Sequence, residues 1–313
     1  MRALCFGSLN RDHTYRLHHF LRPGETNHAL SYDVLAGGKG LNQALSLARA
    51  GAETFMGGCI GEDGLSLQTF LQNNGVDTQY LKKVEAPTGH AIIQVEDSGE
   101  NCILVYPGAN YALTEEQIEE TLGQFAAGDL LLVQNETNLV GMLLQKAKEH
   151  GMITALNPSP ISETLREEIP LAMVDWLILN RAELSALAGA EDLQEAVKHM
   201  QEAYPRCRLV VTLGAEGAVY CDGNGTIRQP AYAVQTVDTT GAGDTFTGYF
   251  LETYYRTLDP KEALRRAAAA AALAVTRPGA AASIPAAEEV SSFLKNNYYK
   301  GDGRDETSIG VSK

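Results

Sequence analysis

Short apolar runs alternate with amphipathic stretches along most of this chain, and glycines close several of the amphipathic stretches. The apolar runs have the length of buried strands, and the amphipathic stretches have the apolar spacing of helices. Strands are predicted at residues 3–9, 54–59, 130–134, 153–156, 176–179, 208–213 and 218–221. Helices are predicted at residues 40–50, 64–74, 114–125, 139–150, 182–188, 244–256 and 260–276. This alternation predicts an α/β fold in which parallel strands form a sheet with helices packed on both faces.

Two β-rich insertions interrupt the alternation, at residues 11–36 and 88–107. The second contains two strand-like runs joined by Asp97-Ser98-Gly99-Glu100, which is a hairpin signal. We predict that both insertions form one small sheet, standing over the main domain as a lid; edge hairpins of the main sheet are the alternative. The predicted organisation is a core of residues 1–10, 37–87 and 108–299, a lid of residues 11–36 and 88–107, and a disordered polar tail of residues 300–313.

The composition of the 313 residues is that of an ordinary globular enzyme, with 44% hydrophobic and 20% charged residues. A formal net charge of −14 argues against nucleic acid and anionic membranes as partners. The N-terminus lacks signal-peptide architecture, and no apolar stretch is long enough to span a bilayer. The five scattered cysteines have no CxxC spacing, so we expect reduced thiols in a cytoplasmic protein. The seven histidines show no metal-binding pattern, so a tight transition-metal site is not expected.

The segment at residues 238–246, Asp-Thr-Thr-Gly-Ala-Gly-Asp-Thr-Phe, carries the strongest chemical signal. Gly241 and Gly243 permit backbone angles and close approaches that a side chain would forbid. The free N–H groups of the helix that follows, together with its dipole, can hold an anion such as a phosphoryl group. Asp244 then lies beside that anion site as a carboxylate that can accept a proton from an alcohol. A glycine-rich turn with a capping aspartate would have the same sequence, so other segments must decide.

Several other nucleotide and hydrolase motifs are absent from the sequence. There is no GxxxxGK[ST] P-loop, and the first predicted strand is followed by Gly-Ser-Leu-Asn-Arg-Asp instead of GxGxxG. There is no GxSxG sequence of the type that carries a hydrolase nucleophile. A Walker-type site, a Rossmann dinucleotide site of the usual form and an α/β-hydrolase are therefore excluded.

A second glycine-rich segment, Gly37-Gly38-Lys39-Gly40-Leu41-Asn42-Gln43-Ala44, accompanies the segment at residues 238–246. Together the two resemble the signature sequences of the PfkB carbohydrate kinase family, and within it those of the ribokinases. Further similarities follow in the same order at residues 6–12, 22–26, 87–91, 99–101, 107–110, 156–160 and 275–280, so the resemblance runs from residue 6 to about residue 295. It implies a ribokinase-like three-layer α/β/α core with a mostly parallel sheet and a small β-sheet lid.

The resemblance also implies roles for individual residues. Asp244 would be the general base that takes the proton of the sugar hydroxyl, and the backbone N–H groups of Gly241, Ala242 and Gly243 would form the anion hole. The implied sugar-binding residues are Asn10, Asp12, Gly38, Lys39, Asn42, Glu136 and Asp244. For Lys39 the ordinary alternative is a solvated lysine at a helix start, and for Asp12 it is a surface ion pair with Arg11.

On the nucleotide side, the resemblance implies ATP with Mg²⁺ and an activating K⁺. Asn180 and Glu183 would organise Mg²⁺ through water, although Arg181 between them is unusual beside a metal shell. The implied ATP-binding residues are Asn180, Thr212, Gly214, Gly217 and Gly243. The implied K⁺ loop contains Asp238, Thr240, Val275, Gly279 and Ser283.

The expected reaction is phosphorylation of a small neutral sugar by ATP, with D-ribose as the favoured substrate. A fructokinase, a 2-keto-3-deoxygluconate kinase or a nucleoside kinase of the same family would share the base and the anion hole. A sugar sensor without catalysis is the alternative from another class, and the presence of Asp244, Gly241 and Gly243 argues against it. An exposed small sheet commonly buries its apolar face against a partner, so we also expect a homodimer formed through the lid.

Overall fold

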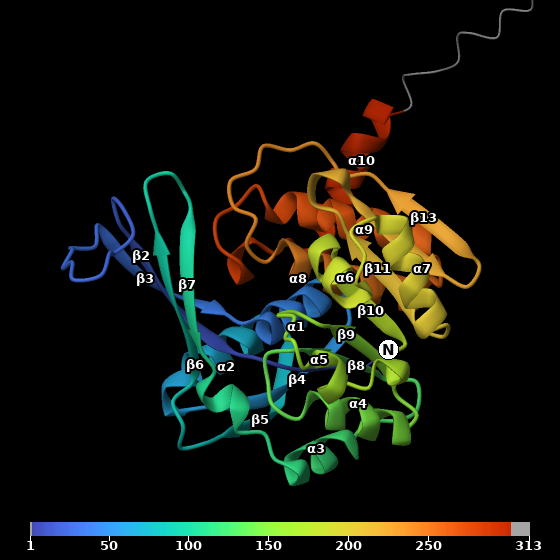
Figure 1. The fold of residues 1–313 in the computed structure, drawn as a ribbon, viewed down its shortest axis with the longest axis horizontal. Coiled ribbons are helices and arrows are strands. Elements are labelled where there is room, and N and C mark those ends of the chain that lie inside the picture. Colours follow the sequence, from blue (N-terminus) through green and yellow to red (C-terminus); the bar gives the residue numbers. More distant parts are fainter. Residues whose placement is uncertain (1, 302–313) are drawn as a thin grey trace, which may run out of the picture.

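The main sheet has nine strands and is mostly parallel (Figure 1). The computed structural model describes residues 2–301 of the chain. In spatial order, the strands are β13 (Gly225–Gln229), β12 (Ala218–Asp222), β11 (Arg208–Thr212), β10 (Trp176–Asn180), β9 (Ile153–Asn157), β8 (Leu130–Gln134), β1 (Arg2–Phe6), β4 (Glu53–Ile60) and β5 (Val76–Lys83). Strands β11, β12 and β13 pair in antiparallel fashion, and the other neighbours pair in parallel.

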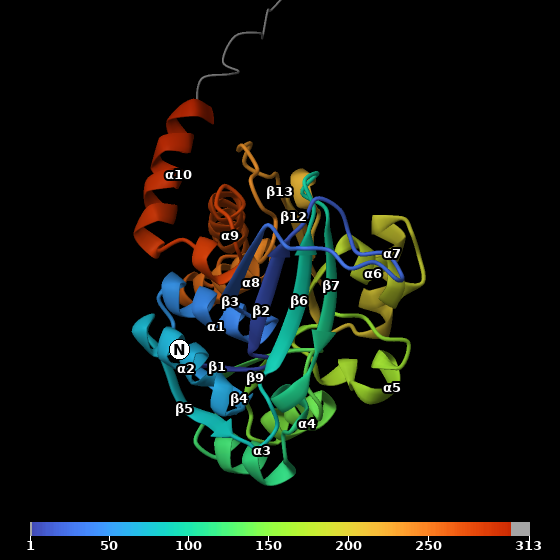
Figure 2. The same ribbon diagram turned by 90° about the vertical axis from the view of Figure 1, so that its left-hand side faces the viewer.

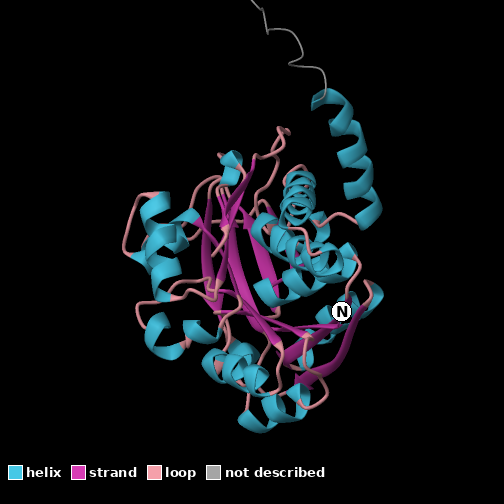
Figure 3. Ribbon diagram, turned by 90° about the vertical axis from the view of Figure 1, so that its right-hand side faces the viewer, coloured by secondary structure: helices cyan, strands magenta, loops and turns pink. Residues whose placement is uncertain are grey.

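Helices cover both faces of this sheet, as the alternating pattern predicts (Figure 3). One face carries α1 (Lys39–Ala50), α2 (Leu65–Asn73), α8 (Ala242–Thr257), α9 (Pro260–Ala274) and α10 (Ala287–Gly301). The other face carries α3 (Glu115–Leu122), α4 (Val140–Glu149), α5 (Leu165–Glu168), α6 (Arg181–Ala188) and α7 (Leu193–Ala203). The three-layer α/β/α core is therefore confirmed.

The central strand β1 shows why the predicted strands are continuous apolar runs. Ala3 and Cys5 point into one hydrophobic core, Leu4 and Phe6 point into the other, and all four are fully buried. A parallel strand covered on both faces has no position that meets water, so its sequence loses the apolar–polar alternation of a half-exposed strand.

The two β-rich insertions form a second, four-stranded sheet (Figure 2). Its strands, in spatial order, are β3 (Ser31–Gly37), β2 (Asn10–Arg16), β6 (Gly89–Val95) and β7 (Asn101–Tyr106). Strands β2 and β6 are parallel, and the two outer pairs are antiparallel. The insertions are therefore a separate sheet, as predicted, and not edge hairpins of the main sheet. That this sheet acts as a lid on a catalytic core stays a prediction.

Five elements, β5, α5, α7, β13 and α10, lie outside the predicted set. Strands β5 and β13 are the two edges of the main sheet, and both carry several polar residues that weaken the strand pattern. Residues 300 and 301 still belong to α10, whereas the remainder of the predicted tail, residues 302–313, lies outside the described residues. Between residues 2 and 301, the longest apolar helices fall short of what a membrane crossing requires.

A close crossing of α1 and α8 sets the position of the site. A Cβ on Gly248 would lie 2.4 Å from the Ser46 hydroxyl oxygen, so only glycine fits at this contact. The Ser46 hydroxyl donates a hydrogen bond to the Thr245 carbonyl at 2.8 Å. The second half of α1 therefore packs against the first two turns of α8, and this crossing places the start of α1 next to Asp244.

Candidate active site

Asp244 lies in the first turn of α8, and its carboxylate is buried against the side chains of α1. The Asn42 amide donates to Asp244 Oδ2 at 3.0 Å, and the Gln43 amide donates to Asp244 Oδ1 at 2.8 Å. The helix begins at Ala242, two residues earlier than predicted, so Asp244 lies inside the first turn and not at its start. Both carboxylate oxygens are thus fixed in direction by amides of another helix.

The two glycines before Asp244 differ in what they do. Gly241 precedes the helix with φ 74°, a left-handed conformation that favours glycine, and a Cβ there would lie 3.0 Å from Ala280. Gly243 needs no such conformation: a Cβ on it would meet nothing within 4 Å. Because Gly243 lines two pockets, its missing side chain leaves those pockets open. The predicted close approach therefore holds for Gly241, and Gly243 supplies space.

The start of α1 is bound to β1 and to the end of β8. Gly38 precedes the helix with φ 93°, and a Cβ there would lie 2.9 Å from the Asn10 nitrogen. The Glu136 carboxylate accepts the backbone N–H of Lys39 at 3.1 Å and also accepts the Ser8 hydroxyl. Burial raises the pKa of Glu136, against the opposing effect of the hydrogen bond from Ser8.

The predicted sugar-binding side chains lie around this helix start. The charge of Asp244 raises the pKa of Lys39 against the effect of burial, with a further contribution from Glu136. Lys39 and Asp244 line the same small pocket. Burial, followed by the charge of Glu136, raises the pKa of Asp12 to about 7. Arg11 pairs with Asp63 at 3.1 Å, so the alternative of an Arg11–Asp12 surface pair is not what the structure shows.

Asn10 is held by a residue that the sequence interpretation missed. The Asn110 amide donates to Asn10 Oδ1 at 2.8 Å, and its own oxygen accepts the Leu9 N–H at 2.9 Å. Asn110 lies in the segment Pro107-Gly108-Ala109-Asn110, which the resemblance included without assigning it a role. A buried asparagine that holds another asparagine is visible only once the fold brings the two together.

A small polar pocket joins residues from both halves of the predicted site. Its volume is about 240 Å³, and its lining includes Lys39, Asn180, Glu183, Thr212 and Asp244. The structure therefore brings the predicted base together with the predicted metal-organising pair. The Asn180 and Glu183 side chains each accept the backbone N–H of the other at 2.9 Å, which forms a capping box at the start of α6.

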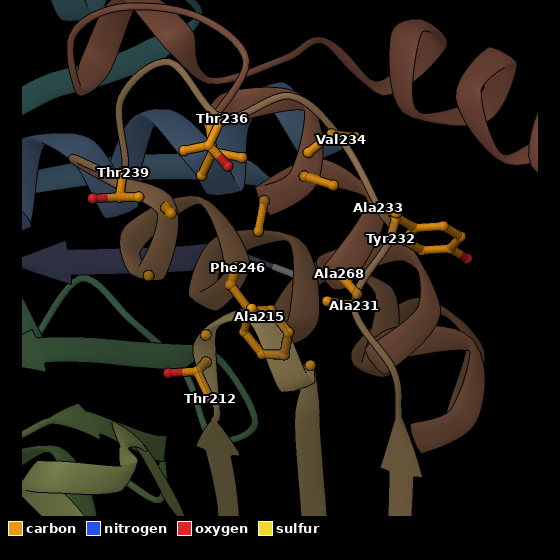
Figure 4. Close-up of a pocket in the computed structure, with 17 residues that line it drawn as sticks. Thr212, Ala215, Ala231, Tyr232, Ala233, Val234, Thr236, Thr239, Phe246 and Ala268 are labelled. Atoms are coloured by element: carbon orange, nitrogen blue, oxygen red, sulfur yellow. The ribbon is translucent and has the colours of Figure 1, made fainter.

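A larger, mainly apolar pocket of about 550 Å³ adjoins the first (Figure 4). Both pockets are lined by Thr212, Thr239 and Gly243. The predicted ATP-binding glycines, Gly214 and Gly217, line the larger pocket. Its other lining residues are Ala215, Ala231, Tyr232, Ala233, Val234, Thr236, Ala242, Phe246, Ala268, Ala271, Ala272 and Val275. Such an apolar cleft beside a helix N-terminus suits a flat heteroaromatic ring carrying phosphates.

The residues present fit a magnesium ion that is held mainly by water and phosphate. Among residues 2–301, no group of three or more histidine, cysteine or acidic side chains could hold a metal by itself. Magnesium bound with a nucleotide usually keeps several waters and takes only one or two carboxylates from the protein. Glu183, which lines the small pocket, is suited to such water-mediated contact.

The predicted cation loop is a compact turn beside the start of α8. Asp238 accepts hydrogen bonds from the Thr240 N–H at 2.9 Å and from the Gly279 N–H at 2.9 Å. Burial alone would raise the pKa of Asp238, but the hydrogen bonds from the Thr240 hydroxyl, the Thr240 N–H and the Gly279 N–H together outweigh it and lower the pKa. The Val275 carbonyl already accepts two backbone N–H groups, and the buried Ser283 hydroxyl donates to the Ala280 carbonyl at 2.8 Å. The lowered pKa therefore favours the ionised Asp238 carboxylate, and the hydrogen bonds hold the loop together.

Arg181 lies at the start of α6 and makes a surface ion pair. Its guanidinium contacts Glu216 at 2.8 Å, and both side chains are exposed. Glu216 also pairs with Arg228 at 3.1 Å. The unusual arginine in the Asn180–Glu183 segment therefore has a protein partner on the surface.

A buried carboxylate in the first turn of a helix, in a polar pocket that adjoins an apolar one, is the arrangement expected of a phosphotransferase that acts on an alcohol group. The chain belongs to the pfkB family of carbohydrate kinases, which it matches over residues 2–287.

Ribokinases are similar to this chain over nearly its whole length. The ribokinase of Haemophilus influenzae is 39% identical over 300 residues, which cover 93% of this chain and 97% of that protein. The ribokinase of Bacillus subtilis is 34% identical over 302 residues, covering 94% of this chain and 100% of that protein. Ribokinase structures from Thermotoga maritima and Arabidopsis thaliana, the latter complexed with ribose and ATP, each superpose with a TM-score of 0.84. They are 36% and 31% identical, and each match covers 94% of this chain, with 99% and 98% of the respective structures.

Proposed function

We propose that this protein is an ATP-dependent ribokinase that converts D-ribose and ATP into D-ribose 5-phosphate and ADP. The observation that carries the proposal is the position of Asp244, which lines the polar pocket within reach of Gly243, where the polar and apolar pockets meet. The sugar would occupy the polar side with Asn10, Asp12, Lys39 and Asn42, and ATP would occupy the apolar side. The similarity to ribokinases supports D-ribose as the acceptor.

In this proposal, the Asp244 carboxylate accepts the proton of the sugar's primary hydroxyl. The hydroxyl oxygen forms a bond to the γ-phosphorus of ATP while the bond to the bridging oxygen of ADP breaks. The backbone N–H groups of Gly241, Ala242 and Gly243 hold the charge of the transferring group at the N-terminus of α8. Catalysis of phosphoryl transfer is mainly positioning and charge stabilisation, so this small set of groups suffices. Magnesium, when bound, neutralises charge on the phosphates.

The test is ADP release with MgATP and potassium across D-ribose, 2-deoxyribose, fructose, 2-keto-3-deoxygluconate and adenosine. Asp244→Ala should abolish turnover, and Asp222→Ala, which changes an aspartate of β12 outside both pockets, should leave it intact. Turnover highest with D-ribose supports the proposal. A preference for another acceptor would contradict D-ribose as the substrate but leave the mechanism unchanged. An active Asp244→Ala variant would contradict the mechanism itself.

A second acceptor, 2-deoxyribose, is favoured by one specific similarity. The deoxyribokinase of Salmonella typhi is 30% identical over 286 residues, which cover 88% of this chain and 93% of that protein. The two pentoses differ by one hydroxyl, so the ratio of their kcat/KM values separates the two functions directly.

We further propose that the enzyme is activated by K⁺, forms a homodimer through the small sheet, and works in the cytoplasm. The ionised Asp238 turn beside the anion hole supports the cation. Apolar side chains exposed on the small sheet, including Tyr32, Ile103 and Leu104, support the dimer. All five cysteines are free, four of them buried, which suits a reducing compartment.

A further inference from the structure

Three buried amide side chains form a connected group behind Asp244. Gln43 comes from α1, Gln134 ends β8 and Asn157 ends β9. Gln43 and Gln134 are fully buried, and Asn157 is 8% exposed. None of the three has a role in the reaction as described above.

Two hydrogen bonds of this group run toward the carboxylate, from Gln134 to Gln43 and from Gln43 to Asp244, and two run from Gln43 through Asn157 to β10. Gln134 Nε2 donates to Gln43 Oε1 at 2.7 Å. Gln43 Nε2 in turn donates to Asp244 Oδ1 at 2.8 Å, and it also lies 3.1 Å from Asn157 Oδ1. Asn157 Nδ2 donates to the Ile178 carbonyl at 2.9 Å.

The chemistry of the groups fixes the direction of each amide. An ionised carboxylate only accepts hydrogen bonds, so Gln43 must present its NH₂ group to Asp244. The Gln43 oxygen then faces Gln134, which must also present its NH₂ group. At the other side, the Ile178 carbonyl only accepts, so Asn157 turns its oxygen toward Gln43. Every orientation is therefore set by a neighbour.

We infer that Gln43 is a positioning residue for the catalytic base, and that Gln134 acts through Gln43 by fixing its orientation. This inference rests on the proposed function, because it assumes that Asp244 is the base. With Asn42 on Oδ2 and Gln43 on Oδ1, the carboxylate plane is held from α1. A carboxylate held in this way is fixed in direction where it lines the polar pocket.

The side-chain oxygen of Gln134 argues that this network does not serve stability alone. Within residues 2–301, the buried Gln134 Oε1 has no hydrogen-bond partner, and a Cβ on Gly7 would lie 2.0 Å from it. A buried acceptor without a partner costs free energy that an apolar side chain of similar shape would not cost. The network therefore retains an energetic cost, which suits a role in catalysis better than a role in stability.

Other titratable groups also face Asp244 and belong in any reading of its pH dependence. They are Lys39 on α1, Glu136 after β8 and Cys5 on β1. Burial raises the pKa of Cys5 to about 12, so this thiol does not ionise where the enzyme would be assayed. Lys39 and Glu136 are unchanged in the variants below, so differences between the variants report on the amides.

The test compares Gln43→Met and Gln134→Met with a matched control, Gln117→Met. Gln117 is another buried glutamine, 4% exposed, that donates to the Gly58 carbonyl at 2.9 Å and lines neither pocket. Kinetic constants for D-ribose and ATP are measured against pH, with thermal unfolding of each variant. Methionine keeps the length of glutamine and removes its hydrogen bonds.

We expect Gln43→Met to lower kcat by about 10–100-fold, as for groups that orient a functional side chain from behind, while both KM values change little. The acidic side of the pH profile should move to higher pH, because the ionised carboxylate loses a donor. Gln134→Met should show a smaller effect of the same kind, and it should add nothing in the Gln43→Met background.

The inference is overturned if Gln43→Met folds and keeps the kcat and the pH profile of the control variant. If Gln43→Met does not fold, Gln134→Met decides alone: an unmoved pH profile there overturns the inference. A wild-type protein without sugar kinase activity, or a fully active Asp244→Ala variant, would instead contradict the proposed function. The two failures are therefore distinguishable.

Discussion

Glu136 accepts the backbone N–H of Lys39 at 3.1 Å, so a carboxylate at the end of β8 caps the first turn of α1. A negative charge at this position also interacts favourably with the dipole of the helix. The same carboxylate accepts the Ser8 hydroxyl, which joins β1 to this helix start. One side chain therefore ties together three segments that carry the predicted sugar-binding residues.

Removing this carboxylate should weaken both stability and sugar binding. Glu136→Ala leaves the Lys39 N–H and the Ser8 hydroxyl without an acceptor, and the loss of a helix cap costs about 0.5–2 kcal/mol. We expect a lower unfolding temperature and a higher KM for the sugar. Glu136→Gln keeps one acceptor and should unfold closer to wild type. Equal unfolding temperatures of Glu136→Ala and wild type would show that the cap contributes nothing.

The sugar KM should depend on pH through Asp12. Its pKa is raised to about 7 by burial and by Glu136, so its carboxylate ionises in the folded protein only near neutral pH. An ionised carboxylate accepts hydrogen bonds from sugar hydroxyls more strongly, so KM should fall as the pH rises through about 7. Asp12→Asn should lose this dependence. If the sugar KM of Asp12→Asn falls with pH as it does in the wild type, the pH dependence belongs to another group.

The same group should make folding stability fall as the pH rises. The pKa of Asp12 is about 7 in the folded protein against 3.8 for the free side chain, so the unfolded chain releases the proton first. The difference in unfolding free energy between wild type and Asp12→Asn should therefore move against wild type between those two values. Urea unfolding at several pH values measures this difference, and a constant difference would contradict the raised pKa.

Enlarging an alanine of α9 should block the larger pocket, which is the proposed nucleotide site. Ala268 lines this pocket together with Ala271 and Ala272 (Figure 4). A leucine at position 268 would fill space that the adenine ring of ATP would need. Ala268→Leu should therefore raise the KM for ATP by about tenfold or more, which corresponds to a loss of about 1.4 kcal/mol of binding free energy. The sugar KM should change little. Because Ala268 also belongs to the buried core, the unfolding temperature of the variant is measured alongside to confirm that it is folded in the assay. An unchanged KM for ATP would place the nucleotide elsewhere.

Potassium should increase turnover more than sodium does at equal ionic strength. The proposed cation site depends on Asp238, which is tied to Gly279 and lies three residues before the anion hole begins. Asp238→Asn should reduce the difference between the two salts, because it removes a negative charge beside the cation. Equal wild-type turnover in potassium and in sodium would contradict activation by potassium.

A charge on the correct face of the small sheet should break the proposed homodimer. Leu104 is 66% exposed and Val105 is 53% exposed, and as neighbours in β7 they point to opposite faces. Leu104→Asp and Val105→Asp therefore test the two faces separately by sedimentation or light scattering. We expect one variant to be monomeric and the other to remain dimeric. A monomeric wild-type protein would contradict the dimer.

The sequence pattern predicted the buried parts of the fold well and its edges poorly. The run at residues 130–134 coincides with β8, because a strand buried on both faces is apolar throughout. Strand β5 escaped prediction because it is an edge strand with exposed polar residues such as Asp77 and Gln79. The start of α8 at Ala242 was missed by two residues, since the glycines that precede Asp244 resemble a loop.

Within the site, residues in glycine-rich motifs could be predicted and their supporting residues could not. Asp244 and Lys39 stand in segments whose spacing is distinctive. Gln134 ends an apolar strand and Asn110 follows a turn, and neither position differs locally from many others in soluble proteins. Their importance comes from contacts with residues about 100 positions away, which only the folded chain reveals.

The bonds from Asn42 and Gln43 to Asp244 span 202 and 201 positions of the chain. During synthesis, the segment that would hold the sugar therefore emerges long before the aspartate that would activate it. A chain that stops before α8 would carry most of the sugar-side residues, yet it would have neither the base nor the helix end that holds the phosphoryl group. Under the proposed mechanism, phosphoryl transfer begins only after α8 has packed against α1, so the order of synthesis would keep incomplete chains catalytically silent.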